Sequence, residues 1–309
     1  MQSGYRQIQR GDLPRKIEFW TNGSDIKIVL NHSCTISNMQ ENNAAFEAWA
    51  LLLKSEGYKN IELSEKDTNM PLSLKDQLHY NRFIYRAINF KKAFSWFSLD
   101  NTLQTKLDSF SEEILSHANL YVNAPIMPYK TESDLHEAKI ERMLIHDDKR
   151  EKLNRLLNVN VKKYFLQLPA SLLIGDVVEG REVFPRGAAR IDLWGLDGST
   201  FNLIELKVGS NKDLGVISQA FFYTCFMHEM YCVKRLEQKD PKGIRKYYEG
   251  KSERGYLNLV NANINFINTH FLLENKHKYF AAAFNEMRKC SFEGVNFNCA
   301  MFSSDSFNP

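Results

Sequence analysis

Apolar residues recur along this chain with two periods, one typical of helices and one typical of strands. Apolar positions three and four apart predict helices in four stretches: 42–55, 73–97, 133–157 and 212–233. Shorter runs with the composition of strands predict strands at 16–20, 25–31, 60–63, 164–168, 190–194, 201–207 and 264–273. Because strands and helices interleave, we expect an α/β fold in which a mixed central sheet is flanked by helices.

Two prolines, Pro125 and Pro128, interrupt the chain between two helical stretches. We therefore expect an N-terminal α+β accessory domain over residues 1–125 and a second domain over residues 130–309. The core of the second domain is expected to run helix, strand, strand, strand, helix, strand, with 264–273 as its final strand.

The strands at 190–194 and 201–207 flank a glycine-rich segment and predict a β-hairpin. Asp197-Gly198 is a strong signal for a two-residue turn. A turn at these two residues places Asp192 opposite Leu203. Side chains on a strand alternate between faces, so this hairpin collects its acidic residues on one side.

Asp192, Glu205 and Lys207 share that face of the predicted hairpin. The backbones of Asp192 and Glu205 become diagonal neighbours about 7–8 Å apart, a spacing at which two carboxylates suit one hard divalent cation. The alternative interpretation is a salt bridge on a half-exposed sheet face. The same spacing of an acid and a lysine at Asp25 and Lys27 is interpreted as an ordinary hairpin.

A long helix is expected to follow this hairpin, with Ser210 or Asn211 as its N-cap. Gln219 and Tyr223 lie four residues apart on this helix and therefore share a face. Strand, capped turn and helix would bring that face over the edge of the hairpin. Taken without its neighbours, this pair is a plain helix surface.

The combined order of these residues resembles the PD-(D/E)XK nuclease superfamily, through Gly187-x-x-Arg190-x-Asp192, Glu205-x-Lys207 and Gln219-x-x-x-Tyr223. The last element resembles the branch that includes RecB and lambda exonuclease. The resemblance covers roughly residues 130–235 and implies a restriction-endonuclease-like core. Ile191 stands where the nominal motif has a proline. The five scattered cysteines do not match the iron–sulfur members of the branch, so no iron–sulfur cluster is expected.

The resemblance also implies a metal site. Asp192, Glu205 and the main-chain carbonyl of Leu206 would hold the ion, and an upstream glutamate would bind it through water. Glu141 is preferred over Glu137 for that role, and a solvated helix face is the alternative for both. A ligand set made only of oxygen favours Mg²⁺ or Mn²⁺ over zinc. Lys207 would orient or deprotonate the attacking water, or stabilise the developing charge.

Candidate contacts to nucleic acid lie on both sides of this core. Arg190 belongs to the hairpin, and Lys242, Arg245 and Lys246 belong to the basic stretch 234–254, which contains Pro and Gly and is expected to be a loop. Ordinary solvated charge is the alternative for this loop. The aromatic residues interleaved with basic residues in 73–97 are interpreted as helix core rather than as a base-stacking surface.

Net charge, apolar runs and cysteine distribution indicate where the protein acts and how it could bind nucleic acid. A net charge of +3 and a pI near 8.4 over 309 residues are only mildly basic, so a nucleic-acid surface must be local. No apolar run reaches transmembrane length, the N-terminus is polar and the cysteines are scattered, so we expect a cytoplasmic protein without a membrane partner.

The sequence therefore predicts a magnesium-dependent deoxyribonuclease, with phage defence, repair and mobile-element processing as possible settings. One alternative is a non-catalytic nucleic-acid-binding or scaffolding module that retains the nuclease fold. Another is a ribonuclease. Gln219 and Tyr223 are expected to reach the substrate, and to favour nucleic acids with free ends.

Overall fold

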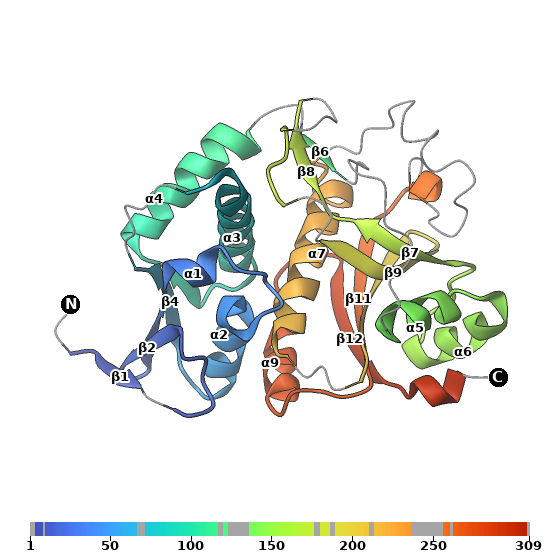
Figure 1. Ribbon diagram of the computed structural model, residues 1–309, viewed down its shortest axis with the longest axis horizontal. Coiled ribbons are helices and arrows are strands. Elements are labelled where there is room, and N and C mark those ends of the chain that lie inside the picture. The colour runs from blue at the N-terminus through green and yellow to red at the C-terminus, as the bar shows by residue number, and fades with distance from the viewer. Residues whose placement is uncertain are drawn as a thin grey trace. The chain divides into compact units, whose positions relative to one another are not determined.

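The computed structural model describes residues 4–8, 10–66, 72–116, 120–122, 136–175, 180–185, 189–209, 213–236, 256–259 and 262–307 (Figure 1). The chain forms two compact units. The first contains Met1–His117, Asp213–Gln219 and His277–Phe292, and the second contains Ala118–Lys212, Ala220–Lys276 and Glu293–Pro309. Two short segments from the C-terminal half, which the sequence interpretation had placed in the second domain, thus cluster with the first unit.

The first unit contains a five-stranded mixed sheet. Its strands follow the order β1 (Arg6–Ile8), β2 (Ile17–Asn22), β3 (Asp25–Leu30), β4 (Asn60–Glu65) and β5 (Phe97–Leu99). The first three strands are antiparallel, and β4 and β5 extend the sheet in parallel. The helical elements are α1 (His32–Thr35), η1 (Asn42–Ala44), α2 (Phe46–Ser55), α3 (Leu74–Ala93), α4 (Asn101–Phe110), η2 (Ser111–Leu115) and α9 (Phe280–Met287).

Helix α3 shows why its aromatic residues belong to the core. Phe83, Tyr85 and Phe90 are each at most 2% exposed, which confirms the core interpretation of this stretch. The predicted helix is too long at its C-terminal end, because the chain leaves α3 at Ala93 and forms β5. The Asp25/Lys27 pair belongs to an ordinary hairpin, as predicted, since Lys27 pairs across the sheet with Glu62.

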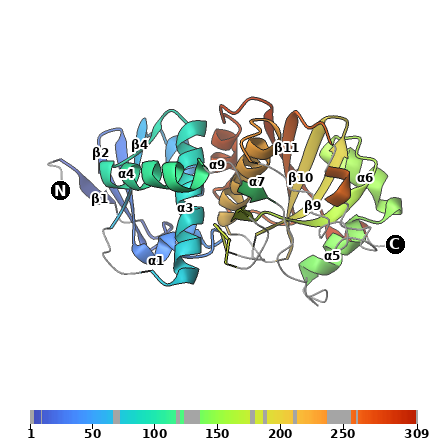
Figure 2. The same cartoon turned by 90° about the horizontal axis from the view of Figure 1, so that it is seen from above.

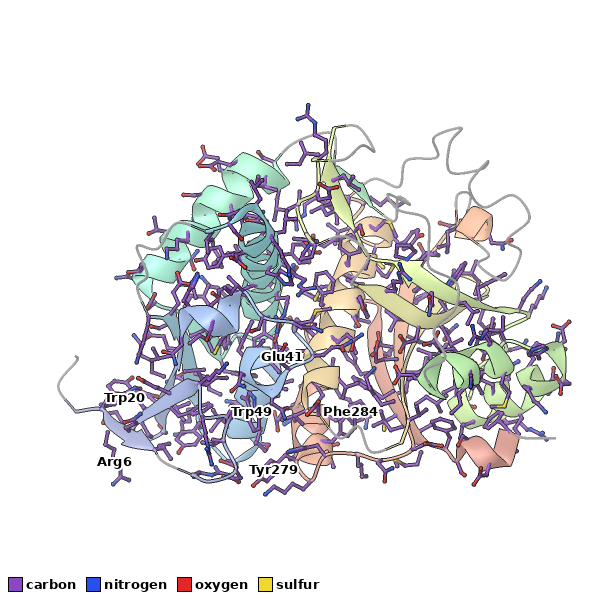
Figure 3. All side chains as sticks on the ribbon, viewed as in Figure 1. Arg6, Trp20, Glu41, Trp49, Tyr279 and Phe284 are labelled. Carbon is purple, nitrogen blue, oxygen red and sulfur yellow. The ribbon has the colours of Figure 1, made fainter. Side chains whose placement is uncertain are left out.

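Two segments distant in sequence complete the first unit. Helix α9 packs against α2, and Figure 3 shows Trp49 of α2 and Phe284 of α9 on these neighbouring helices. The residues that lead into helix α7 (Gly215–Tyr231) are tied to Asn42, whose Oδ1 accepts the main-chain N–H of Leu214. A Cβ on Gly215 would lie 1.9 Å from the main-chain oxygen of Gln40, so only glycine fits at this close approach.

The second unit contains another five-stranded mixed sheet, in the order β12 (Val295–Met301), β11 (Phe266–Leu273), β10 (Thr200–Lys207), β9 (Arg190–Asp197) and β7 (Tyr164–Pro169). Strands β7, β9 and β10 are antiparallel, whereas β10, β11 and β12 are parallel. The remaining elements are β6 (Leu120–Val122), β8 (Leu172–Ile174), α5 (His136–Leu144), α6 (Asp147–Leu157), η4 (Tyr256–Leu259), η5 (Ser304–Phe307) and most of α7. The predicted α/β class, with mixed sheets flanked by helices, is confirmed.

Helices cover both faces of this sheet, and Figure 2 shows α7 on one side and α5 and α6 on the other. On the α5–α6 side, buried Ile140 and Leu153 pack in one cluster with Leu193, Ile204 and Leu206 of the sheet. On the α7 side the contacts are aromatic and polar, as in the stacked rings of Phe201 and Tyr231 and the hydrogen bond between Thr224 and Thr269. None of the described helices is long and apolar enough to cross a membrane.

The structure corrects the predicted hairpin register. Thr200 pairs with Asp197, so the two-residue turn is Gly198-Ser199 rather than Asp197-Gly198. Gly198 takes a positive φ of 57° at the first turn position, while the Asp197 carboxylate accepts the main-chain N–H of Asn160. Because the shift is two residues, every side chain keeps its predicted face.

Two further predictions about elements were wrong. The helix predicted over 133–157 is two helices, because His146 is extended (φ −66°, ψ 140°) and Asp147 and Asp148 begin a new helix whose N-terminus favours acidic residues. The strand at 264–273 is not the last, since β12 follows it at the sheet edge. β12 has only one buried residue, Phe297, so its pattern carries little hydrophobic signal.

Candidate metal centre

The register of β9 and β10 brings the predicted acidic pair together. Leu193 pairs with Ile204, and the next position along each strand puts Asp192 opposite Glu205, closer than the predicted diagonal arrangement. The Asp192 carboxylate accepts the main-chain N–H of Leu206 at 2.8 Å, which fixes its orientation. Glu205 is 0% exposed. The hairpin therefore places two carboxyl groups side by side on one face.

Helix α5 adds two more carboxyl groups to this place. Glu137, Glu141 and Asp192 each offer a carboxylate oxygen, and these three oxygens lie within 4.8 Å of one another, so the cluster could hold a metal ion. The choice between Glu137 and Glu141 as the upstream acid is therefore not exclusive, because both reach Asp192. Glu137 and Glu141 lie four residues apart, so one helix face presents both.

Lys207 joins this cluster through two of its acids. Its Nζ is 2.7 Å from Glu205 Oε1 and 3.4 Å from Glu137 Oε1, and it donates to the main-chain carbonyl of Leu206 at 2.9 Å. Lys207 is only 7% exposed. A buried ammonium needs such partners, because an unpaired charge in the interior is strongly unfavourable.

Gln167 is a member of this cluster that the sequence interpretation missed. On β7 it lies opposite Asp192, between the pairs Leu166–Leu193 and Leu168–Ile191. Its Nε2 donates to Glu141 Oε2 at 2.7 Å, and its Oε1 is buried without a hydrogen-bond partner among the described residues.

The backbone of Gln167 is also unusual. Its φ is +46°, a left-handed conformation that costs a non-glycine residue energy and is concentrated at functional sites. The one sequence signal was its polar side chain within the apolar strand Tyr164–Leu168.

Burial and neighbouring charges shift the pKa values of Asp192, Glu141, Glu205 and Lys207. Burial raises the pKa of Asp192 to about 6 against the lowering effect of Lys207, and burial together with the Asp192 charge raises the pKa of Glu141 to about 8. Burial and Asp192 hold the pKa of Glu205 well above its ordinary range. Burial lowers the pKa of Lys207, but Glu205, Asp192 and Glu137 outweigh this and raise it.

The donor atoms fit a hard divalent cation. Every candidate ligand is an oxygen, and Glu205 Oε2 is buried without a hydrogen bond from any described residue. Such an atom costs free energy unless something binds it. A cation between Asp192 and Glu205 would satisfy it and would offset the repulsion among the carboxylates.

Three more of the predicted site residues lie at the start of β9 and on α7. Tyr223 is 0% exposed, and its hydroxyl accepts the main-chain N–H of Arg190 at 2.8 Å, so it anchors the start of β9 two residues before Asp192. Gln219 is 2% exposed and belongs to the part of α7 that clusters with the first unit. The substrate contacts of Arg190, Gln219 and Tyr223 stay predictions.

Several predicted residues lie outside the described residues. These are the glycine of the nominal motif, the three cations of the basic stretch and the two predicted helix caps: Gly187, Lys242, Arg245, Lys246, Ser210 and Asn211.

Comparison with known proteins adds no assignment. No family model, curated protein or solved structure matches this chain.

Gln167→Leu tests the support given to Glu141. Leucine keeps the volume and the left-handed backbone cost but removes the amide that donates to a buried carboxyl group. We expect the free energy of unfolding in urea to fall by about 1–3 kcal/mol. Gln77→Leu is the matched control, because Gln77 is exposed on α3 and its side-chain amide donates to its helix neighbour Asn81. Its effect should stay within about 0.5 kcal/mol. Equal small effects in both variants would show that Gln167 does not support Glu141.

Metal binding itself should be measurable as stabilisation. A cation that binds only the folded cluster raises the free energy of unfolding by about 2.7 kcal/mol at a free concentration 100 times its Kd. We expect the thermal midpoint to rise with Mg²⁺ or Mn²⁺ concentration in the native protein and to stay nearly constant in Asp192→Asn. A midpoint that ignores both ions, or that rises equally in the variant, would contradict a cation site at Asp192.

Proposed function

We propose that the second unit is a metal-dependent nuclease that hydrolyses phosphodiester bonds of DNA. The observation that carries the proposal is the convergence of four carboxyl groups and one lysine from three separate elements. Glu137 and Glu141 come from α5, Asp192 from β9, and Glu205 and Lys207 from β10. A structural salt bridge needs one acid for one lysine, so this excess of carboxyl groups, two of them buried (Glu141 and Glu205), favours a cation site.

The surrounding fold supports the same proposal. Within the five-stranded sheet and its helices, the chain order is α5 and α6, the antiparallel strands β7, β9 and β10, α7, and then β11 parallel to β10, while β8 pairs with β6 in a separate sheet. This agrees with the order of helix, strands, helix and strand that the PD-(D/E)XK resemblance implies. We infer a restriction-endonuclease-like core, to which β12 adds an edge strand.

The chemistry follows from the charges that such a site presents. A phosphodiester resists hydrolysis because its anionic oxygens repel hydroxide and because an alkoxide is a poor leaving group. Bound Mg²⁺ or Mn²⁺ would neutralise phosphoryl oxygens and lower the pKa of a bound water. Asp192 and Glu205 would hold the ion, with the Leu206 carbonyl and the α5 glutamates in the same cluster.

The chain's own groups have separate tasks in this scheme. The main-chain N–H of Leu206 orients the Asp192 carboxylate. Gln167 orients Glu141. The Lys207 ammonium, held between Glu205 and Glu137, is placed to orient the attacking water or to stabilise charge that develops at the phosphate.

A cleavage assay tests the proposal. The protein is incubated with linear duplex DNA, closed circular DNA, single-stranded DNA and RNA, each with Mg²⁺ and with EDTA. We expect Mg²⁺-dependent cutting of DNA, with linear or single-stranded forms preferred over closed circles. Cutting of RNA alone would make the protein a ribonuclease. No cutting of any substrate, by protein that binds Mg²⁺, would contradict the catalytic proposal.

A further inference from the structure

A second feature of the second unit is a pocket of about 680 Å³ between α6 and the segment that follows β12. Its walls include Lys152, Arg155 and Leu156 of α6, together with Met301 and Phe302. Figures 1 and 2 both show α6 near the C-terminal end of the chain. A pocket of this size is large enough for a nucleotide-sized ligand.

The polar wall of the pocket is cationic. Lys152 lies on the ring of Phe307, with its Nζ 4.7 Å from the ring centroid, and its ammonium also donates to the main-chain carbonyl of Ser306. Arg155 is exposed, and among the described residues it forms no ion pair or hydrogen bond. Its five N–H donors are therefore available to an anion, and a guanidinium binds phosphate through paired hydrogen bonds.

The acid in the pocket, Glu274, is held by the main chain. Its two carboxylate oxygens accept the N–H groups of Gly209 and Ser304, each at 2.7 Å. These bonds hold the Glu274 carboxylate in place. The pocket lining thus contains two cations, Lys152 and Arg155, and one acid, Glu274, that the main chain holds.

The pocket lining also contains apolar side chains. Met301 is 46% exposed, one of the few large apolar side chains so exposed among the described residues, and Phe302 and Leu156 are half-buried beside it. A lining that combines cationic with apolar side chains matches a nucleotide, which pairs a phosphate with a base that packs on apolar and aromatic groups.

The pocket lies at the same sheet edge as the metal centre. Strands β10, β11 and β12 are parallel, so their carboxyl ends, including Lys207 and Met301, share one edge. Glu274 follows β11, and its main-chain N–H donates to the carbonyl of Lys207 at 3.0 Å. One hydrogen bond therefore links the pocket wall to the backbone of the lysine in the metal centre.

We propose that this pocket binds one nucleotide of the substrate DNA strand beside the phosphate to be cut. Arg155 and Lys152 contact its phosphate, and Met301 and Phe302 contact its base. This inference rests on the proposed nuclease function, because it assigns a flanking subsite to the same substrate.

Equilibrium binding in EDTA tests the pocket without cleavage. Fluorescence anisotropy follows a labelled single-stranded thymidine oligonucleotide on the native protein, on Arg155→Gln and on Arg150→Gln. Arg150 is the matched control, because it lies on the same helix but pairs with Glu151 and donates to the Lys162 carbonyl. We expect Arg155→Gln to weaken binding about three- to tenfold and to reduce the slope of log Kd against log salt by about 0.7, the loss of one phosphate contact on a single strand. Arg150→Gln should change neither.

Two further measurements test the contact to the base separately from the contact to the phosphate. Met301→Gln should weaken binding without changing the salt slope, since it carries no charge. Thymidine monophosphate should displace the oligonucleotide at lower concentration than inorganic phosphate does. Equal displacement by both competitors, equal binding by Arg155→Gln and Arg150→Gln, or no binding to the native protein would each overturn the nucleotide subsite.

The outcome is independent of the nuclease test. If the native protein cuts DNA with Mg²⁺ while Arg155→Gln binds normally, the subsite fails and the nuclease stands. If binding depends on Arg155 but no DNA is cut, the nuclease fails and the pocket remains a nucleic-acid site.

Discussion

Asp192→Asn and Glu205→Gln should each abolish Mg²⁺-dependent cleavage of DNA while the protein stays folded. Each substitution removes an anionic ligand with little change in volume, and we expect turnover to fall by at least roughly 10²-fold, as when a charge-stabilising group is lost from an active site. The fold should survive because Lys207 keeps another acidic partner, Glu137, in either variant. Cleavage of labelled linear DNA at saturating Mg²⁺ measures turnover, and circular dichroism checks the fold.

The matched controls lie on the surface of the same unit. Asp148→Asn and Glu151→Gln make the same chemical changes on exposed positions of α6, with acid side chains that are 67% and 70% exposed. Both should cut DNA as the native protein does. Turnover within a few-fold of native in both cluster variants would refute Asp192 and Glu205 as ligands. Should Glu205→Gln fail to fold, Asp192→Asn still decides the point.

Lys207→Met should separate catalysis from metal binding. The variant keeps every carboxyl group, so calorimetry should still detect the cation. Turnover should fall by roughly 10²–10⁴-fold, the usual contribution of a positioned catalytic group that exchanges protons or charge with the substrate.

The control for Lys207→Met is Lys163→Met, which removes an exposed lysine that lies over the ring of Phe165. It should leave turnover unchanged. A Lys207→Met protein that binds no metal but still cuts DNA at high Mg²⁺ would show that Lys207 organises the ligands instead of acting on the substrate.

Local patterns in the sequence predicted the hairpin that carries the site. Alternation over 201–207 was enough to put Glu205 and Lys207 on one face, and glycine at 198 was enough to predict a turn. The register was wrong by two residues because Asp197-Gly198 and Gly198-Ser199 are both acceptable turns. In the observed register the Asp197 carboxylate accepts a hydrogen bond from the main-chain N–H of Asn160, a residue outside the hairpin.

Tertiary contacts explain what the sequence could not show. The left-handed backbone of Gln167 has no signature in the pattern of a strand. Gly215 is needed only because the chain near Gln40 approaches it, so sequence gave no reason to place 213–219 in the first unit. How α5 packs likewise decides which of its glutamates comes close to Asp192. In the structure both Glu137 and Glu141 do so.

The most direct test of a metal centre in the second unit is the position of a bound ion. Crystals grown with Mn²⁺ and measured at a wavelength where manganese scatters anomalously would locate it. We expect an anomalous peak bonded to carboxylate oxygens of Asp192 and Glu205, with Glu141 or Glu137 in its coordination sphere or one water away. A peak elsewhere, or a cluster in which Lys207 still pairs with Glu205 at saturating Mn²⁺ and no ion is bound, would contradict it.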